Sequence, residues 1–502
     1  MTDKILFWLD SNLIYFGIAK YLQEQYKCKS YAIIEVPSLQ KKFFKEQNII
    51  ELEKSWFYYD NVVKKKSSPD LNYLSNFEKK YELNLWLLAY NERLFYNHND
   101  FYKFSSNEVL NILEQECKFF EKVLDETKPD FIIMAAPNLH YNYLFHKMCL
   151  KRKIKCLILG PSRFGNRCIL SEQPDTIDDS FEENNQGPER TRTELMNFLK
   201  NDTLYEENNN FKKNFNSSRK ERIKASFKFL FSNNKKIKTH YPYFGRTKLK
   251  IILKTIGWLI REPYRLSFID KTLSKNLDNE KFIYFPLQID IEASILIFAP
   301  FYTNQLELVI SIMKSLPIGY KLYVKDHPLQ NSRGWRSISF YKKIMSLPNV
   351  KLLHHSINPD EILERCSAVI TISSTAGMEA ALYKKPSILL ADSLFSNLPS
   401  VNKIKNINEL PLAINSTLDT EVKISDVNKF VNFIYKNSIK FSLSKFIVDT
   451  EEHFYYSGFL VDLQITEEKM NSYLKINETK FQLLVSEHIK KINYFKNTKT
   501  DV

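Results

Sequence analysis

The sequence predicts an α/β protein with two doubly wound parallel sheets, and three observations support this class. The chain has 502 residues, more than one hydrophobic core usually organises, and 44% of them are hydrophobic. Short apolar segments alternate with helical patterns near the amino terminus, and this alternation returns at 282–392. The other segments are polar and mostly helical in pattern. We therefore expect four parts: a Rossmann-like domain (1–170), an acidic loop with a basic helical insertion (171–280), a second Rossmann-like domain (281–400), and carboxyl-terminal helices that pack back on the first domain (401–502).

The amino-terminal region has the pattern of a strand, a helix and a second strand. An apolar strand at 4–9 ends at Asp10, and a second strand is expected at 30–36. Asp10 either caps the intervening helix or takes part in an active site, and the sequence leaves both interpretations open. Residues 55–105 show no clean periodicity. Further elements of a parallel sheet are expected at 109–126 (helix), 131–135 (strand), 139–151 (helix) and 155–159 (strand).

Two arginines lie in the short loop GPSRFGNR, directly after the strand expected at 155–159. Arginine binds carboxylates and phosphates through two parallel hydrogen bonds. Arg163 and Arg167 are therefore candidate substrate-binding residues, with solvated surface arginines as the alternative.

A histidine marks the end of another apolar strand, expected at 322–324. This strand stops at KDHP, where Pro328 ends regular pairing and leaves His327 and Lys325 at a carboxyl strand end. In open parallel sheets, ligands bind beyond the carboxyl ends of strands. Taken alone, a His-Pro pair is more often a simple turn.

A strand expected at 369–372 is followed by a small hydroxyl-rich turn and a helix start. The turn comprises Ser373, Ser374, Thr375, Ala376 and Gly377. Unpaired N–H groups and the dipole of a helix start both attract anions. Such a turn is often only a cap with a close-packed glycine. Its occurrence with His327 in one βαβ series favours a nucleotide-phosphate site.

Three segments near these motifs carry a family resemblance. FPLQIDIEAS at 285–294, NQLELVISIMKSLPIGYKLYVKDHP at 304–328 and EAALYKKPSILL at 379–390, with the serine turn between them, resemble the capsule polysaccharide synthesis family of bacterial glycosyltransferases. That family includes transferases that add Kdo, an eight-carbon acidic sugar, from CMP-Kdo. The resemblance is close over about the third quarter of the chain and looser near the amino terminus. It implies a GT-B-like fold, in which two Rossmann-like domains face a cleft.

The resemblance also implies roles for individual residues. Glu292 matches the glutamate of the family's Gln-Pro-Glu turn, although Ile291 replaces the proline and leaves the geometry of this loop open. Glu379 would receive ribose hydroxyls of a bound nucleotide, and the loop with Arg163 and Arg167 resembles an arginine-containing turn of the acceptor-side domain. The sequence does not decide whether Asp10, Asp290 or Glu292 is the catalytic base. As catalytic residues we predict Glu292, Asp10 and His327, and as substrate-binding residues Lys325, His327, Ser373, Ser374, Thr375, Gly377, Glu379, Arg163 and Arg167.

The net charge of +14 indicates an anionic partner. The lysines are widely spread and no zinc-finger, RRM or helix-turn-helix spacing occurs, so specific nucleic-acid binding is not expected. Two helical segments combine apolar faces with lysines: Phe227, Leu230 and Phe231 beside Arg222, Lys224 and Lys228, and Leu249, Ile252, Leu253 and Ile256 beside Lys248, Lys250 and Lys254. Such helices can lie on anionic lipid. Packing on a domain, with the lysines in water, is the preferred expectation.

The six cysteines form no metal-binding or disulfide pattern, and no metal or cofactor is expected beside the nucleotide-sugar donor. The start, MTDKILFWLDSNLIYFG, has acidic residues in place of the basic region of a signal peptide. We therefore expect a cytoplasmic protein, with the inner face of the cytoplasmic membrane as a further location to test.

The expected function is transfer of a sugar, with Kdo from CMP-Kdo as the first choice, onto a capsular or other surface polysaccharide or glycolipid. Three alternatives stay open. The chain could transfer glycerol-phosphate from CDP-glycerol, organise a capsule-assembly complex without catalysis, or bind nucleic acid through its basic charge.

Overall fold

The computed structural model describes residues 2–63, 68–96, 98–179, 181, 187–201, 219–231, 240–330 and 334–498. The chain divides into two compact units. Unit 1 comprises Met1–Asp178, Asp202–Arg246 and Asn437–Val502, and unit 2 comprises Asp179–Asn201 and Thr247–Lys436. The predicted insertion at 171–280 is thus shared between the two units. Its residues 180, 182–186, 202–218 and 232–239 lie outside the described residues.

Unit 1 contains a six-stranded sheet with the order β3-β2-β1-β4-β5-β6. The first five strands are parallel and β6 is antiparallel to β5. The register pairs Asp10 with Glu35, so both acidic residues stand at the same edge of the sheet. The strands are β1 (Asp3–Asp10), β2 (Cys28–Glu35), β3 (Lys54–Phe57), β4 (Phe131–Ala135), β5 (Lys155–Pro161) and β6 (Cys168–Ser171).

Both faces of this sheet are buried because its strands alternate between two cores. Ile5, Phe7 and Leu9 of β1 pack with α1 and the carboxyl-terminal helices, whereas Leu6 and Trp8 pack with α4, α6 and α7 on the other face. The helices of unit 1 are α1 (Ile14–Gln25), α2 (Lys41–Glu46), α3 (Tyr58–Asn61), α4 (Leu71–Tyr81), α5 (Leu85–Asn91), α6 (Ser106–Thr127), α7 (His140–Lys151), α10 (Arg219–Phe231), the 3-10 helix η2 (Tyr241–Tyr243), α20 (Leu443–Phe454), α21 (Glu467–Ile476) and α22 (Glu478–Thr498).

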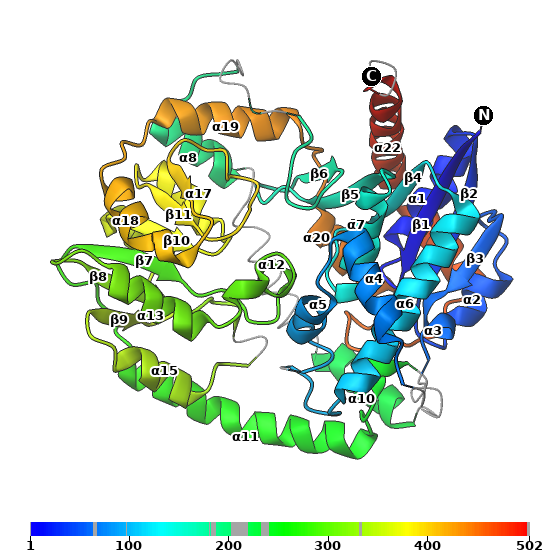
Figure 1. The fold of residues 1–502 in the computed structure, drawn as a ribbon, viewed down its shortest axis with the longest axis horizontal. Coiled ribbons are helices and arrows are strands. Elements are labelled where there is room, and N and C mark those ends of the chain that lie inside the picture. Colours follow the sequence, from blue (N-terminus) through cyan, green and yellow to red (C-terminus); the bar gives the residue numbers. More distant parts are fainter. Residues whose placement is uncertain are drawn as a thin grey trace. The chain divides into compact units, whose positions relative to one another are not determined.

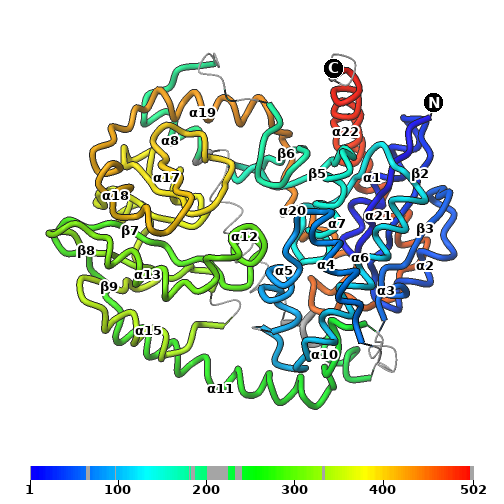
Figure 2. Tube along the Cα trace, viewed as in Figure 1, coloured from blue at the N-terminus to red at the C-terminus, as the bar shows by residue number. Residues whose placement is uncertain are grey.

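The carboxyl-terminal helices pack on the amino-terminal helix α1, and Figure 2 shows the red α22 beside it. The hydroxyl of Tyr21 in α1 donates to the carbonyl of Leu474 in α21 at 3.0 Å. Gly17 lies so close to Phe481 that a Cβ at this position would be 2.2 Å from the ring. A glycine is therefore required where α1 meets α22.

Unit 2 contains a second six-stranded sheet with the order β12-β11-β10-β7-β8-β9, and all of its strands are parallel. The strands are β7 (Phe282–Pro286), β8 (Lys321–Lys325), β9 (Val350–Leu353), β10 (Ala368–Thr371), β11 (Ser387–Leu389) and β12 (Val401–Lys403). The helices are α8 (Arg192–Asn201), α11 (Lys248–Thr272), α12 (Ala293–Leu296), η3 (Pro300–Tyr302), α13 (Gln305–Ser315), α15 (Ile338–Met345), α16 (Pro359–Arg365), α17 (Ala376–Leu382), η4 (Ile407–Glu409), α18 (Leu410–Leu418) and α19 (Ile424–Lys436). Figure 1 shows both sheets with their helices.

The predicted fold class is confirmed: the chain forms two doubly wound α/β sheets and a helical carboxyl-terminal region. Within the described residues, none of the helices combines the length and apolarity needed to cross a bilayer.

The preferred expectation for the lysine-rich helices is wrong. Their apolar residues do not pack on a domain: Phe231 of α10 is 84% exposed, and Leu249 and Leu253 of α11 are 66% and 58% exposed. The side chain of Arg222 lies outside the described residues. The sequence pattern is amphipathic, but the structure turns this apolar side toward solvent.

Candidate functional site

Three loops of unit 2 leave adjacent strands at the same edge of its sheet. Because β10, β7 and β8 are neighbours and parallel, their carboxyl ends stand side by side. The serine turn follows β10, Gln288 follows β7 soon after its end, and His327 follows β8. The predicted motifs of His327 and Ser374 are thus separated by one strand, at the edge where parallel sheets bind ligands.

Arg336 ties two of these loops together from within the protein. Its guanidinium donates to Asp326 (Nε to Oδ2, 3.2 Å), to Asp290 (2.5 Å) and to the carbonyl of Gln288 (2.5 Å). Arg336 is 6% exposed and Asp326 is 3% exposed. Burial lowers the pKa of Arg336, but the two carboxylates outweigh it, so the pKa is raised and the guanidinium stays charged. The network fixes the residue before His327 relative to Gln288.

Gln288 extends this network to the serine turn. With its amide oxygen turned toward the turn, the side chain accepts from the backbone N–H groups of Ser374 (2.7 Å) and Ser373 (3.2 Å). The Ser374 N–H also donates to Thr371 Oγ1 at 3.1 Å. Two N–H groups that the sequence assigns to a phosphate therefore have partners in the protein. The partly exposed Ser374 hydroxyl accepts from the Ala376 N–H at 3.3 Å and can donate its proton to a ligand. The Thr375 hydroxyl, also partly exposed, donates to Glu379.

His327 is half-buried, and its ring is oriented by the turn that follows. The N–H of Leu329 donates to His327 Nδ1 at 3.1 Å. This bond places the proton of the neutral imidazole on Nε2, so Nε2 is a hydrogen-bond donor.

The other predicted residues of unit 2 differ in accessibility. Lys325 is 2% exposed, and its ammonium donates to the carbonyl of Ile357 at 2.5 Å. Glu379 accepts from the Thr375 hydroxyl at 2.8 Å, and burial raises the pKa of Glu379. A Cβ at Gly377 would lie 3.0 Å from Phe395. Lys325 and Gly377 thus have structural roles next to the site, while their predicted ligand contacts stay predictions.

The two carboxylates after β7 have different surroundings. Asp290 pairs with Arg336 and accepts from Gln305 Nε2 at 2.7 Å, so it holds the loop in place. Glu292 is exposed at the N-cap position of α12, with the Ser294 hydroxyl 3.5 Å from its carboxylate. Of the two, Glu292 is the more accessible to a substrate.

In unit 1, both predicted arginines bind groups of the protein. Arg163 makes a two-bond contact with Asp175, at 3.1 Å (Nε) and 2.5 Å (Nη2). Arg167 donates to the hydroxyl and the carbonyl of Ser438, both at 2.7 Å. These bonds hold the loop after β5, and the predicted substrate contacts of both arginines stay predictions.

Asp10 and Glu35 form a pair of partly exposed carboxylates at the ends of β1 and β2. Burial raises the pKa of Asp10 to about 6, against hydrogen bonds from Asn12. Burial also raises the pKa of Glu35 to about 7, and the charge of Asp10 contributes, although Trp8 and two tyrosine hydroxyls donate to Glu35. A carboxylate with a pKa near 7 is suited to proton transfer.

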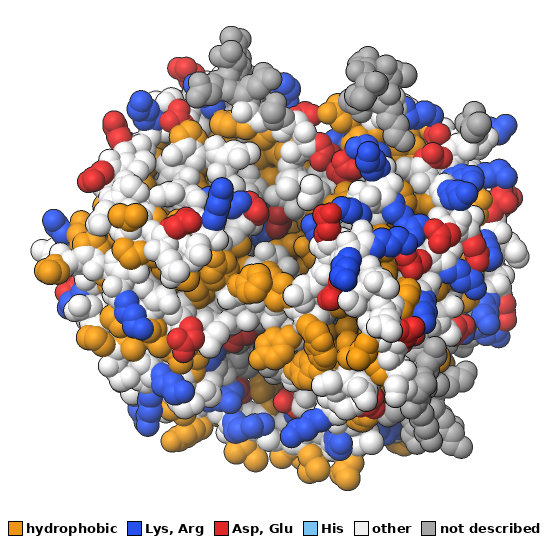
Figure 3. Space-filling view, viewed as in Figure 1, with side chains coloured by type: hydrophobic (Ala, Val, Ile, Leu, Met, Phe, Trp, Pro, Cys, Tyr) orange, Lys and Arg blue, Asp and Glu red, His pale blue; other side chains and the backbone are white. Residues whose placement is uncertain are grey.

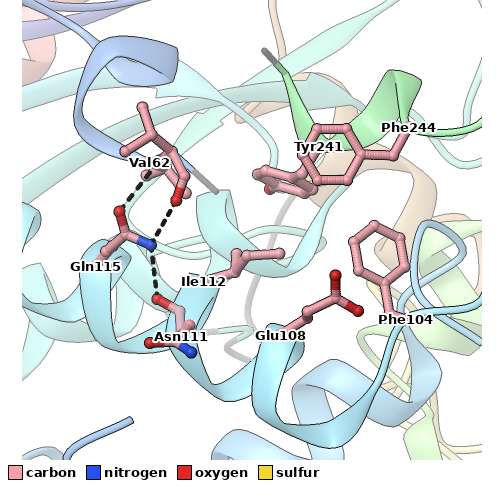
Figure 4. Close-up of a pocket in the computed structure, with 9 residues that line it drawn as sticks. Val62, Phe104, Glu108, Asn111, Ile112, Gln115, Tyr241 and Phe244 are labelled. Atoms are coloured by element: carbon pink, nitrogen blue, oxygen red, sulfur yellow. Dashed lines mark hydrogen bonds between the residues drawn. The ribbon is translucent and has the colours of Figure 1, made fainter. Parts of the chain in front are cut away.

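A small pocket of unit 1 lies away from these residues. Figure 4 shows it between α6 and the turn at Tyr241, with the Gln115 amide bonded to the backbone of Val63 and Asn111. Beside it, the Tyr241 hydroxyl donates to Glu116, which together with Glu92 binds the fully buried His140. None of the predicted site residues lines this pocket, so the described residues give it no link to the predicted chemistry.

One group of possible metal ligands occurs among the described residues: Asp270, His354 and His355, whose ligand atoms lie within 4.8 Å of one another. His354 already donates toward Asp270 at 2.9 Å and contacts the Ser356 hydroxyl at 2.6 Å. These hydrogen bonds account for the positions of the His354 and Asp270 side chains without a metal ion.

Sequence reasoning missed Arg336, Gln288 and Glu35. The position of Gln288 two residues beyond β7, and of Glu35 at the end of β2, is the signal that could have found them. Arg336 offers no such signal, because it lies between elements and only its burial shows its role.

Comparison with known proteins finds a family match that includes the loops after β7, β8 and β10. Residues 172–398 match the model of a family described as "Capsule polysaccharide biosynthesis protein". The predicted family resemblance is confirmed. The capsule-synthesis match contains His327, Gln288 and the serine turn, and it does not reach Asp10, Arg163 or Arg167. None of the curated proteins matches the chain.

Similar solved structures are distant. UDP-GlcNAc 2-epimerase from Methanocaldococcus jannaschii is 13% identical over 87% of this chain and 100% of its own, with a TM-score of 0.24. KpsC from Thermosulfurimonas dismutans, described as a beta Kdo 2,7 transferase, is 12% identical over 62% of this chain and 79% of its own, with a TM-score of 0.28. Scores this low carry no argument about this chain.

Proposed function

We propose that this chain is a nucleotide-sugar-dependent glycosyltransferase of capsule or other surface-polysaccharide synthesis, and that unit 2 binds the donor. The match to the capsule polysaccharide biosynthesis family supports the class. The observation that carries the proposal is the hydrogen-bonded series from the serine turn through Gln288 and Arg336 to Asp326, beside His327. It joins two polar motifs at the ligand-binding edge of a parallel sheet.

Sugar transfer breaks the bond between the anomeric carbon and a phosphate oxygen of the nucleotide. The acceptor oxygen forms the new bond and loses its proton to a base, while negative charge develops on the departing phosphate. Fixed donors lower the barrier when they meet that charge. The Nε2–H of His327 and the hydroxyl of Ser374 are suited to this role, whereas the Thr375 hydroxyl donates to Glu379 and can only accept from a ligand. No step requires a metal.

The base and the acceptor contacts are part of the same proposal. Asp10 and Glu292 are the candidates for the base, since the carboxylate of Asp290 is held by Arg336. Arg163 and Arg167 are the candidates for an anionic acceptor. Burial raises the pKa of Asp10 to about 6, which suits this carboxyl group to proton transfer.

CMP-Kdo is the first donor to test. Isothermal titration with CMP, UDP and GDP should give binding of CMP, and Ser374→Ala should weaken it by up to about tenfold. Thr420→Ala, which removes a hydroxyl bonded to a helix carbonyl, is the matched control. Binding of UDP or GDP alone would remove the CMP assignment and keep the transferase class. If no nucleotide binds, the proposal fails.

Transfer of glycerol-phosphate from CDP-glycerol would also release CMP, so nucleotide binding cannot separate the two reactions. Mass analysis of products formed from CMP-Kdo and from CDP-glycerol separates them.

A further inference from the structure

Helix α11 carries a continuous row of exposed apolar side chains. We call it the α11 stripe, and its members follow helical spacing along one face. They are Leu249, Ile252, Leu253, Ile256, Leu259, Ile260, Tyr264 and Leu266. The least exposed member, Leu266, is 37% exposed, and the most exposed, Tyr264, is 72% exposed. An apolar row of this extent on a protein surface marks an interaction site.

The helix is held firmly at its other face and carboxyl-terminal half. Glu262 is buried, accepts from the Trp335 N–H at 2.9 Å and pairs with Arg265 at 2.8 Å. Asp270 pairs with His354 at 2.9 Å. Because these contacts orient α11 on unit 2, the α11 stripe is presented as a fixed surface.

The charge of the helix selects its partner. Residues 248–261 contain Lys248, Lys250, Lys254 and Arg261 and no acidic residue. At 100° per residue, Lys248 and Lys250 lie at the two edges of the stripe, whereas Lys254 and Arg261 lie on the far side of the helix. Two copies of the chain joined through the stripe would bring the lysines at its edges together, whereas an anionic lipid surface attracts them.

We propose that α11 binds the surface of an anionic lipid bilayer, with the α11 stripe inserted among the headgroups and Lys248 and Lys250, at the edges of the stripe, against lipid phosphates. The stripe extends for about 26 Å along the helix, so the helix would lie in the plane of the interface. Figure 3 shows hydrophobic side chains gathered along the lower edge, where Figure 1 places α11, interspersed with lysine and arginine. This inference is independent of the proposed transferase reaction.

Flotation of the full chain with vesicles tests the proposal. Vesicles of phosphatidylcholine with about a third phosphatidylglycerol should bind the protein at low salt, and vesicles of phosphatidylcholine alone should bind it much less. The double variant Leu253→Gln/Ile260→Gln should lower the partition coefficient about tenfold or more. The control Ile318→Gln/Leu412→Gln removes two apolar side chains that are fully exposed and 79% exposed elsewhere on unit 2, and it should bind as the parent does.

The charge-reversed variant Lys248→Glu/Lys250→Glu provides an independent test if the apolar variant folds poorly. It should release the protein from anionic vesicles. Absence of binding at low salt, or equal binding by parent and both test variants, would overturn the proposal. So would a dimer in light scattering that Leu253→Gln/Ile260→Gln converts to a monomer without any vesicle binding, since the stripe would then join two copies.

Discussion

Arg336 Nε lies 3.2 Å from Oδ2 of Asp326, the residue immediately before His327, and both side chains are almost fully buried. A buried ion pair stabilises a fold only when its partners are fully satisfied. Here Asp326 also accepts from the Tyr341 hydroxyl at 2.7 Å, and Arg336 uses its other nitrogens on Asp290 and the Gln288 carbonyl. The pair therefore fixes the loops after β7 and β8 to each other.

Arg336→Met should lower the free energy of unfolding by about 3–5 kcal/mol, because it leaves Asp326 and Asp290 without their cation. Urea denaturation followed by circular dichroism measures this change. Lys314→Met, at an exposed position of α13 in the same unit, should cost less than about 1 kcal/mol. Equal stability of the two variants would contradict the buried network.

His327→Ala should lower kcat for sugar transfer by about a hundredfold or more if Nε2–H stabilises the departing phosphate. His327→Gln can place an amide N–H near the same position, so it should recover part of the loss. The assay uses the donor whose nucleotide binds in titration, with thermal denaturation to check folding. Unchanged turnover in His327→Ala would reject the role.

Most of the fold could be predicted because the apolar strands end at residues that interrupt regular strand pairing, such as proline or a run of serines. The strand before Pro328 and the strand before Ser373 were expected within one residue of β8 and β10. The edge strands β9 and β12 were not predicted, because they have four and three residues and carry no distinct apolar pattern. Helix α11 was predicted from its period, but periodicity cannot tell whether an apolar face meets protein or solvent.

The site was predictable only where a residue stands at a strand end. That rule found Asp10 and His327, and applied to β2 it would have found Glu35 as well. The bonds of Arg336 join loops that are far apart in sequence, from Gln288 to Asp326. A single sequence carries no pattern for such contacts, so the network that orders the site emerges only from the fold.

Gly377→Ala should destabilise unit 2 by about 1–3 kcal/mol and weaken nucleotide binding. The added methyl would lie 3.0 Å from the Phe395 ring and 3.1 Å from the Thr371 side chain, so these side chains or the serine turn must shift. Gly160→Ala is the control, since its Cβ would meet its nearest neighbour, Ala136, at 3.9 Å. Thermal denaturation and CMP titration measure the two effects. A Gly377→Ala variant with parental stability would mean that the turn yields at no cost.

The raised pKa of Asp10, about 6, makes stability depend on pH. The carboxyl group is more readily protonated in the folded chain than in the unfolded chain, where its pKa is about 4. The contribution of this carboxyl group to the free energy of unfolding is therefore fully present below about pH 4 and is lost as the pH rises through 6. Asp10→Asn stays neutral, so its melting temperature relative to the parent should rise between pH 4.5 and 7.5, by the equivalent of about 1–3 kcal/mol. Glu421→Gln, in an exposed loop, should show a flat difference over this range.

The same variant tests Asp10 as the base. If the carboxylate accepts the acceptor's proton, kcat/KM of the parent should rise with pH through about 6, and Asp10→Asn should lose both this rise and most of the turnover. Glu292→Gln is the matching variant for the competing candidate. A parental pH profile in Asp10→Asn, together with a collapsed rate in Glu292→Gln, would assign the base to the loop after β7 and leave Asp10 without a role in proton transfer.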